Sequence, residues 1–175
     1  MNKAVLIFNG KGGVGKDYLA NYLRNKYTVN IVSSVDKIKE AADIIEPGIS
    51  TRKNLNDRSF LSTLKAIAND YYCHSLRYLK SQFSYFMQKP EQILIVMIRE
   101  EDEIKQFKKI LNSLYDFKNV HAVLIANKEQ EYELYGNLSD DGIHKDSNVY
   151  DLVFDNAMTK ESNELFIKEI DELIK

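Results

Sequence analysis

Five short runs of apolar residues along the chain have the length of buried β-strands. Continuous apolar runs of about four to eight residues are typical of strands that are covered on both faces of a parallel sheet. The runs cover residues 4–8, 29–32, 91–98, 120–126 and 149–154. The sequence therefore predicts a parallel sheet of about five strands.

Between these runs, apolar residues recur every three or four positions, which is the period of an amphipathic helix. The periodic stretches cover residues 19–27, 34–45, 57–88, 104–114 and 159–174. Strands that alternate with helices through short connections predict an α/β fold with helices on both faces of the sheet. We expect the whole chain, residues 1–175, to form a single domain.

Two segments depart from this alternation. Residues 57–88 contain two successive helical stripes without a strand between them, which predicts a helical insertion over about residues 50–88. Residues 127–148 are polar and include Gly136 and Gly142, which predicts a long loop or lid. The remaining residues supply the alternating strands and helices.

Composition and charge narrow the classes of function. The net charge is −2, and lysines and acids are mixed along the chain, so neither nucleic acid nor an anionic membrane is favoured as a partner. The single cysteine, Cys73, cannot form an internal disulfide. No apolar stretch approaches the ~20 residues of a membrane span. We expect a cytoplasmic protein that binds small molecules.

A glycine-rich loop follows the first predicted strand and opens the first predicted helix. Its sequence, GKGGVGKD, matches the phosphate-binding pattern G-x-x-x-x-G-K-[ST] up to the last position. Glycines let the backbone turn several N–H groups toward one anion, and Lys16 reaches the β- and γ-phosphates. A simple glycine-rich helix cap explains neither the four glycines nor the lysine. The residues expected to bind ATP are Gly10, Lys11, Gly12, Gly13, Val14, Gly15, Lys16 and Asp17.

Asp17 stands where the pattern has a hydroxyl residue. A carboxylate can also hold Mg²⁺, directly or through a water, because hard cations prefer oxygen ligands. Without metal, its charge would repel the phosphates. The alternative is an acidic residue in the first turn of a helix, stabilised by the helix dipole. We expect Asp17 to be the metal-linked residue of the loop.

The loop and Arg99 are expected to meet. Ligands of parallel α/β sheets bind beyond the carboxyl ends of the strands, and both features directly follow a predicted strand. A guanidinium binds phosphate through two parallel hydrogen bonds. Lys16 and Arg99 are therefore the candidate catalytic residues for a phosphoryl transfer.

The segment KGGVGK (Lys11–Lys16) resembles the deviant phosphate loop of the chromosome-partitioning and division-site ATPases. This resemblance implies a nucleotide-dependent switch that acts by dimerisation, with Lys11 acting across the dimer. The chain departs from that family at Asp17. It also has VNIVSSVDKIKE where the family has an aspartate-rich switch.

The longer segment GKGGVGKDYLANYL resembles the loop of one branch of the nucleoside-monophosphate kinase superfamily. That branch contains the phage-type deoxynucleoside monophosphate kinases and the animal-type phosphomevalonate kinases, and its loop ends in GKD. Gly12, Gly13 and Val14 depart from its basic and serine positions. The other similar blocks are SSVDKIKE, NDRSFLSTLKAI, VMIREEDEIKQF, YGNLSDDG and YDLVFDN.

The kinase resemblance implies a P-loop NTPase fold and ATP- and Mg²⁺-dependent phosphoryl transfer to a small phosphorylated acceptor. A (deoxy)nucleoside monophosphate is the expected acceptor, and a phosphomevalonate-type acceptor stays open. Related kinases usually carry an arginine in the lid, whereas residues 127–148 contain only Lys128 and Lys145 as cations. A homologue that binds nucleotide without turnover therefore stays open, as does the choice between monomer and homodimer.

The same resemblance implies an acceptor-binding group of residues, namely Asp36, Lys37, Arg58, Lys65 and Arg99. Arg58 and Lys65 are seven positions apart, two turns along one helix face, so both can point at the same anion. Each can instead be a solvated charge on a helix face. Asp36 can also serve simply as a helix-start carboxylate.

Overall fold

The structure is a computed structural model that describes residues 3–52, 54–127, 143 and 147–175. The described part contains one sheet of five strands. They are β1 (Ala4–Asn9), β2 (Val29–Ser33), β3 (Ile93–Met97), β4 (Val120–Ala126) and β5 (Leu152–Asp155). The helices are α1 (Lys16–Tyr22), α2 (Asp36–Ile45), α3 (Leu55–Tyr72), α4 (His74–Met87), α5 (Glu101–Tyr115) and α7 (Lys160–Leu173).

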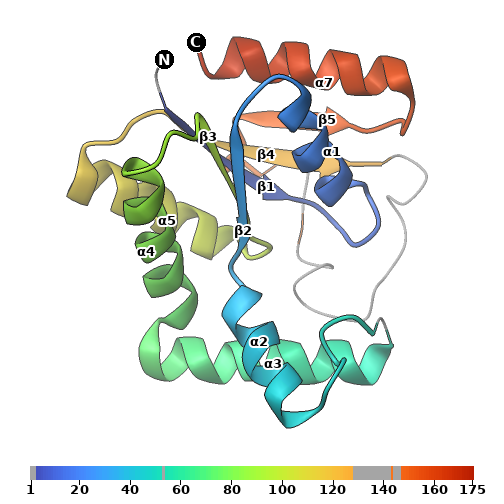
Figure 1. The fold of residues 1–175 in the computed structure, drawn as a ribbon, viewed down its shortest axis with the longest axis vertical. Coiled ribbons are helices and arrows are strands. Elements are labelled where there is room, and N and C mark those ends of the chain that lie inside the picture. Colours follow the sequence, from blue (N-terminus) through green and yellow to red (C-terminus); the bar gives the residue numbers. More distant parts are fainter. Residues whose placement is uncertain (1–2, 53, 128–142, 144–146) are drawn as a thin grey trace.

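The strands lie in the order β2-β3-β1-β4-β5, and every neighbouring pair is parallel (Figure 1). Strand β1, which the glycine-rich loop follows, therefore lies in the centre of the sheet. Phe8 pairs with Met97, and Met97 pairs with Ser33, so the carboxyl ends of β1, β2 and β3 are level. The predicted α/β fold with a five-stranded parallel sheet is confirmed.

Helices cover both faces of the sheet, as the continuous apolar strands require. On one face, α1 and α7 contribute Leu19, Leu23, Phe166 and Ile170 to an apolar core. On the other face, α4 and α5 pack their phenylalanines and leucines against the sheet. Figure 1 shows these two helical layers with the sheet between them.

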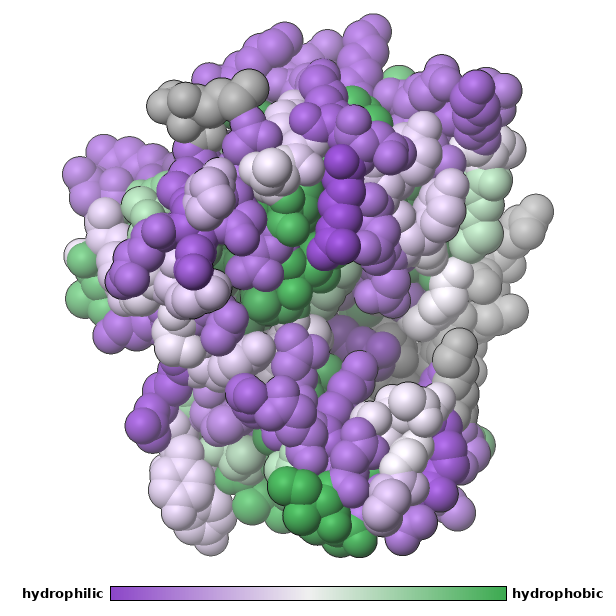
Figure 2. Space-filling model, viewed as in Figure 1, coloured by the Kyte–Doolittle hydropathy of each residue, from purple (hydrophilic) through white to green (hydrophobic). Residues whose placement is uncertain are grey.

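Helices α2 and α3 lie beyond the carboxyl ends of the strands, at the lower end of the molecule in Figure 1. Helices α3 and α4 fall within residues 50–88, where the sequence predicts a helical insertion. At this end Figure 2 shows apolar residues on a largely hydrophilic face, and the exposed apolar side chains of α2 and α3 include Ile44, Ile45 and Ile67.

The predicted boundaries differ from the structure mainly at β5. Val149 is buried, but it lies in a turn, and the strand begins at Leu152. An apolar run marks burial, and it cannot distinguish a buried turn from a strand. The predicted lid lies mostly outside the described residues, and so do Lys128 and Lys145. Within the described residues, no helix is long and apolar enough to cross a membrane.

Candidate active site

The loop between β1 and α1 needs glycine at two of its positions. Gly10 has φ +142°, and a Cβ there would lie 2.2 Å from the carbonyl oxygen of Ile125 on the neighbouring strand β4. Gly15 has φ +88°, and a Cβ there would lie 2.5 Å from Nδ2 of Asn156. Any side chain at either position would clash and would be strained. The glycines therefore let the loop pass close to β4 and β5.

Lys16 begins α1 and folds back over the loop. Its Nζ donates to the carbonyl oxygens of Gly10 and Lys11, at 2.5 Å in both cases. The residue before it, Gly15, forms the N-cap and brings no side chain to the start of the helix. The loop thus combines a bent glycine backbone, a helix start and an ammonium group, which together suit a phosphate group.

Asn156, directly after β5, makes a hydrogen bond to the backbone of the loop. Its Nδ2 donates to the carbonyl oxygen of Val14 at 2.9 Å, and its Oδ1 accepts from the N–H of Met158 at 2.9 Å. The side chain is buried, and both of its polar ends are satisfied. Sequence reasoning missed this residue. Its only signal is a polar residue at a strand end in the segment FDN.

Asp17 lies in the first turn of α1, and its side chain is exposed. An exposed carboxylate beside the loop offers the oxygen ligand that Mg²⁺ prefers. No group of three or more His, Cys, Asp or Glu that could hold a metal is present among the described residues. A Mg²⁺ shared with nucleotide phosphates needs few protein ligands, so the loop fits the metal without such a cluster.

Asn9, the last residue of β1, connects the loop to Arg99. Its Oδ1 accepts from the N–H of Gly10 at 2.6 Å, and its Nδ2 donates to the carbonyl oxygen of Arg99 at 3.0 Å. Arg99 itself is exposed. The expectation that the loop and Arg99 share one edge of the sheet is confirmed. Asn9 is a further residue that sequence reasoning missed.

Lys65 lies in a different environment from the one expected. It is buried, and its Nζ donates to Oε2 of Glu103 at 2.9 Å and to a carboxylate oxygen of Glu100. Ser34 is a third, longer contact at 3.4 Å. A direct contact with an acceptor would require Lys65 to exchange these carboxylates. That Arg58 and Lys65 point at the same anion stays a prediction.

The pKa values of the two carboxyl groups around Lys65 are shifted in opposite directions. Burial raises the pKa of Glu100, but the charge of Lys65 and its hydrogen bond outweigh burial and hold that pKa below its usual range. Burial raises the pKa of Glu103 above its usual range, and the neighbouring charge of Glu100 adds to the rise.

Asp36 begins α2 next to the end of β2. Its Oδ2 accepts from the N–H of Ser33, the last residue of β2, at 2.7 Å, and the hydroxyl of Tyr78 lies 3.5 Å away. Burial and the charge of Asp36 raise the pKa of Tyr78 to about 12.

Lys37 is exposed and pairs with Glu40 at 2.5 Å. Arg58 is half-buried near the start of α3.

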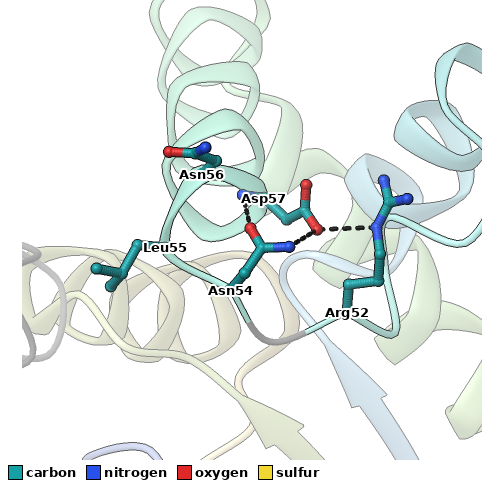
Figure 3. Close-up of a pocket in the computed structure, with 5 residues that line it drawn as sticks. All are labelled: Arg52, Asn54, Leu55, Asn56 and Asp57. Carbon is teal, nitrogen blue, oxygen red and sulfur yellow. Dashed lines mark hydrogen bonds and ion pairs between the residues drawn. The ribbon is translucent and has the colours of Figure 1, made fainter.

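A shallow hollow of about 460 Å³ lies at the start of α3 (Figure 3). Asp57 accepts there from Nε of Arg52 at 2.9 Å and from Nδ2 of Asn54 at 2.6 Å. Figure 3 shows the side chains of Leu55 and Asn56 pointing away from this group. The charged groups of the hollow neutralise one another, so it adds no clear phosphate-binding charge to the site.

The sequence matches no family model and no curated protein sequence. The fold is similar to that of solved structures at low identity. The tunicamycin resistance protein of Deinococcus radiodurans is 13% identical, with 98% of this chain and 95% of that one covered and a TM-score of 0.59. The APS kinase of Mycobacterium tuberculosis, solved with AMPPNP and APS, is 12% identical, with 98% and 97% covered and a TM-score of 0.52.

A shikimate kinase from Bacteroides thetaiotaomicron is similar as well, at 11% identity, with 97% of each chain covered and a TM-score of 0.50. These likenesses extend over nearly the whole chain, so they concern the complete sheet with its helices and not the loop alone. The narrower kinase branch expected from the GKD loop stays a prediction. The chain has the P-loop α/β fold that the APS kinase and the shikimate kinase share.

Proposed function

We propose that this protein transfers the γ-phosphoryl group of ATP to a small phosphorylated acceptor, with a (deoxy)nucleoside monophosphate as the expected acceptor class. The observation that carries the proposal is the Asn9 bridge. One side chain bonds the first residue of the phosphate loop and the carbonyl oxygen of Arg99. The start of the loop and the backbone of Arg99 lie together at the edge where α/β proteins bind ligands, which supports a donor site beside this arginine.

The loop is the donor site in this proposal. Backbone N–H groups between Gly10 and Lys16 surround the phosphates of ATP, together with Lys11, Gly12, Gly13 and Val14. Lys16 exchanges its two carbonyl partners for phosphate oxygens, since a charge-assisted hydrogen bond is stronger than one to a neutral carbonyl. Lys16 then stabilises the charge that develops on the transferred group.

Asp17 would hold Mg²⁺ directly or through a water. The metal, when bound, neutralises charge on the β- and γ-phosphate oxygens. The carboxylate is exposed in the first turn of α1, so a cation can reach it from solvent. With no metal present, the same carboxylate repels the phosphates.

Arg99 is the acceptor-side catalytic residue in this proposal. Its backbone is held by the end of β3 and by Asn9, so the guanidinium can grip the acceptor phosphate and keep it in line with the γ-phosphate. Lys37 and Arg58 supply further positive charge from α2 and α3. Asp36 lies at the same edge, where it can accept a hydrogen bond from the acceptor.

The choice of acceptor class rests on the resemblance of the GKD loop and on the helical insertion at the acceptor side. Phosphomevalonate belongs in the same test, because the resembled branch includes kinases of that acceptor. The likeness to the APS and shikimate kinases supports phosphoryl transfer in general. It does not select the acceptor.

The test is ADP release with Mg²⁺-ATP across a panel of nucleoside and deoxynucleoside monophosphates, phosphomevalonate and an acceptor-free control. We expect at least one acceptor to raise ADP release well above the control, and Lys16→Ala to abolish the increase. Lys109→Ala, an exposed lysine on α5, is the matched control. Binding of ATP without turnover on any acceptor would indicate a nucleotide-binding homologue and would overturn the kinase proposal.

A further inference from the structure

Three consecutive residues between β3 and α5 are each bonded to a different part of the molecule. The carbonyl oxygen of Arg99 accepts from Asn9, at the base of the phosphate loop. The carboxylate of Glu100 accepts from Lys65 of α3. The carboxylate of Glu101 accepts from Ser147 at 2.6 Å and lies 3.4 Å from the hydroxyl of Tyr150. We call residues 99–101 the junction.

The bond from α3 to the junction is unusual for a helix of this length. The structure describes all 18 residues of α3, and Lys65 is the one that is buried. Several large apolar side chains of the helix, such as Phe60, Ile67 and Tyr71, are exposed, and Leu61 and Leu64 are only partly buried. No apolar side chain of α3 is fully buried. The ion cluster around Lys65 connects α3 to the junction and to α5.

A buried ion cluster of this kind is poor at stabilising a fold and good at specifying one geometry. Taking Lys65, Glu103 and part of Glu100 out of water costs much of what their attraction returns, and an apolar residue of similar size would often be as stable. Glu100 keeps about a third of its side chain exposed, at 38%, and it is the residue next to Arg99. The cluster is placed to hold the backbone next to Arg99.

We propose that Lys65 and Glu100 are positioning residues that couple the acceptor-side helix α3 to Arg99. The proposal rests on the proposed function. Lys65 holds Glu100, the peptide between Glu100 and Arg99 transmits this position, and Asn9 ties the same carbonyl to the loop. An acceptor seated against α3 is thereby aligned with the γ-phosphate on the loop. Lys65 acts through Glu100 and does not itself contact the acceptor.

The main variant is Glu100→Gln, because Glu103 still pairs with Lys65 when Glu100 loses its charge. We expect about 10- to 100-fold lower turnover with acceptor, since small misplacements of reacting groups have effects of that size. ATP affinity should stay within about twofold, because the loop binds ATP through other groups. Lys65→Met should have a larger effect on turnover, and Lys65→Arg should restore part of it. Lys80→Met, an exposed lysine on α4, is the matched control.

A double-mutant cycle separates positioning from a merely structural role. If Glu100 acts through Arg99, then Glu100→Gln should have little further effect on turnover in an Arg99→Lys background. Effects that multiply would show that Glu100 acts independently, and this would overturn the proposal. So would unchanged turnover in both Glu100→Gln and Lys65→Met.

Amide hydrogen exchange tests the coupling without any activity measurement. In Glu100→Gln and Lys65→Met we expect faster exchange of the junction and of the Ile104 N–H, which donates to the Glu100 carbonyl oxygen. Exchange in β4 should match that of Lys80→Met. Unchanged exchange at the junction would overturn the coupling even if the protein is a kinase. Faster exchange in a protein without acceptor-dependent turnover would support the coupling and reject the proposed function.

Discussion

Asn156 and Val14 are 142 positions apart in the sequence, and the side-chain amide of Asn156 donates to the carbonyl oxygen of Val14 at 2.9 Å. This bond connects the backbone of the phosphate loop at Val14 to the end of β5. Because Asn156 is buried and bonds a backbone carbonyl of the loop, it stabilises the shape of the loop.

The first prediction concerns this bond. Asn156→Ala leaves the buried carbonyl of Val14 without its donor, so we expect a loss of about 1–3 kcal/mol in the free energy of unfolding. A looser loop should bind ATP about tenfold more weakly. Urea unfolding and calorimetric ATP titration measure the two effects, with Asn112→Ala on the exposed side of α5 as the control. Unchanged ATP affinity would mean that the loop keeps its shape without Asn156.

The second prediction concerns Lys16. Removing its charge-assisted hydrogen bonds should cost about 1.5–3 kcal/mol of phosphate binding, which corresponds to about ten- to a hundredfold weaker ATP affinity or more. The free energy of unfolding should change less than ATP affinity, because the ammonium bonds the loop carbonyls of Gly10 and Lys11 in the protein alone. ATP titration of Lys16→Ala beside Lys109→Ala is the measurement. Equal affinity in both would reject the loop as the ATP site.

The third prediction concerns Asp17 and its metal. Asp17→Asn removes a negative charge beside the phosphates, so metal-free ATP should bind more tightly. The same change removes a ligand for Mg²⁺, so the gain in affinity that Mg²⁺ produces should shrink. Titrations with EDTA and with Mg²⁺ measure the two effects. Asp102→Asn, in the first turn of α5, controls for the loss of a helix-start acid.

Equal changes with and without Mg²⁺ would leave Asp17 as a helix-start residue only. In that case Asp17→Asn and Asp102→Asn should also cost similar amounts of stability, about 0.3–1 kcal/mol each.

The fourth prediction concerns Arg99. Arg99→Lys keeps the charge and loses the planar fork, so turnover with acceptor should fall although ATP affinity stays the same. Arg99→Ala should lower turnover further, and Arg58→Ala should have a milder effect of the same kind. Acceptor KM, kcat and ATP affinity are measured for each variant. The control is Arg24→Lys, which changes an exposed arginine just after the end of α1. Weaker ATP binding with intact acceptor kinetics would move Arg99 to the donor site.

The fifth prediction separates the kinase from a switch that acts by dimerisation. For a kinase, light scattering should give the same mass with and without ATP, and Lys11→Ala should not change the oligomeric state. A partitioning-type ATPase should instead form an ATP-dependent dimer that Lys11→Ala abolishes. The second result would favour the switch over the proposed phosphoryl transfer.

The strands, the helices and the phosphate loop were predictable from the sequence because each depends on local patterns. Continuous apolar runs mark β1, β3 and β4, and the period of helical stripes marks α4 and α5. The order of strands along the chain was enough to place the loop and Arg99 at one edge, because all parallel strands end on the same side. The apolar pattern wrongly placed the start of the last strand at Val149, because this residue packs into the core from a turn.

Which polar side chains meet was decided only by the tertiary structure. Asn9 reaches Arg99 across 90 positions, Lys65 reaches Glu100 across 35, and Tyr150 reaches Glu101 across 49. No local period encodes such pairs. From the sequence, Lys65 was a charge on a helix face that could face an anion. In the structure it is buried against two carboxylates of the segment that follows β3, and these partners lie 35 and 38 positions away in the sequence.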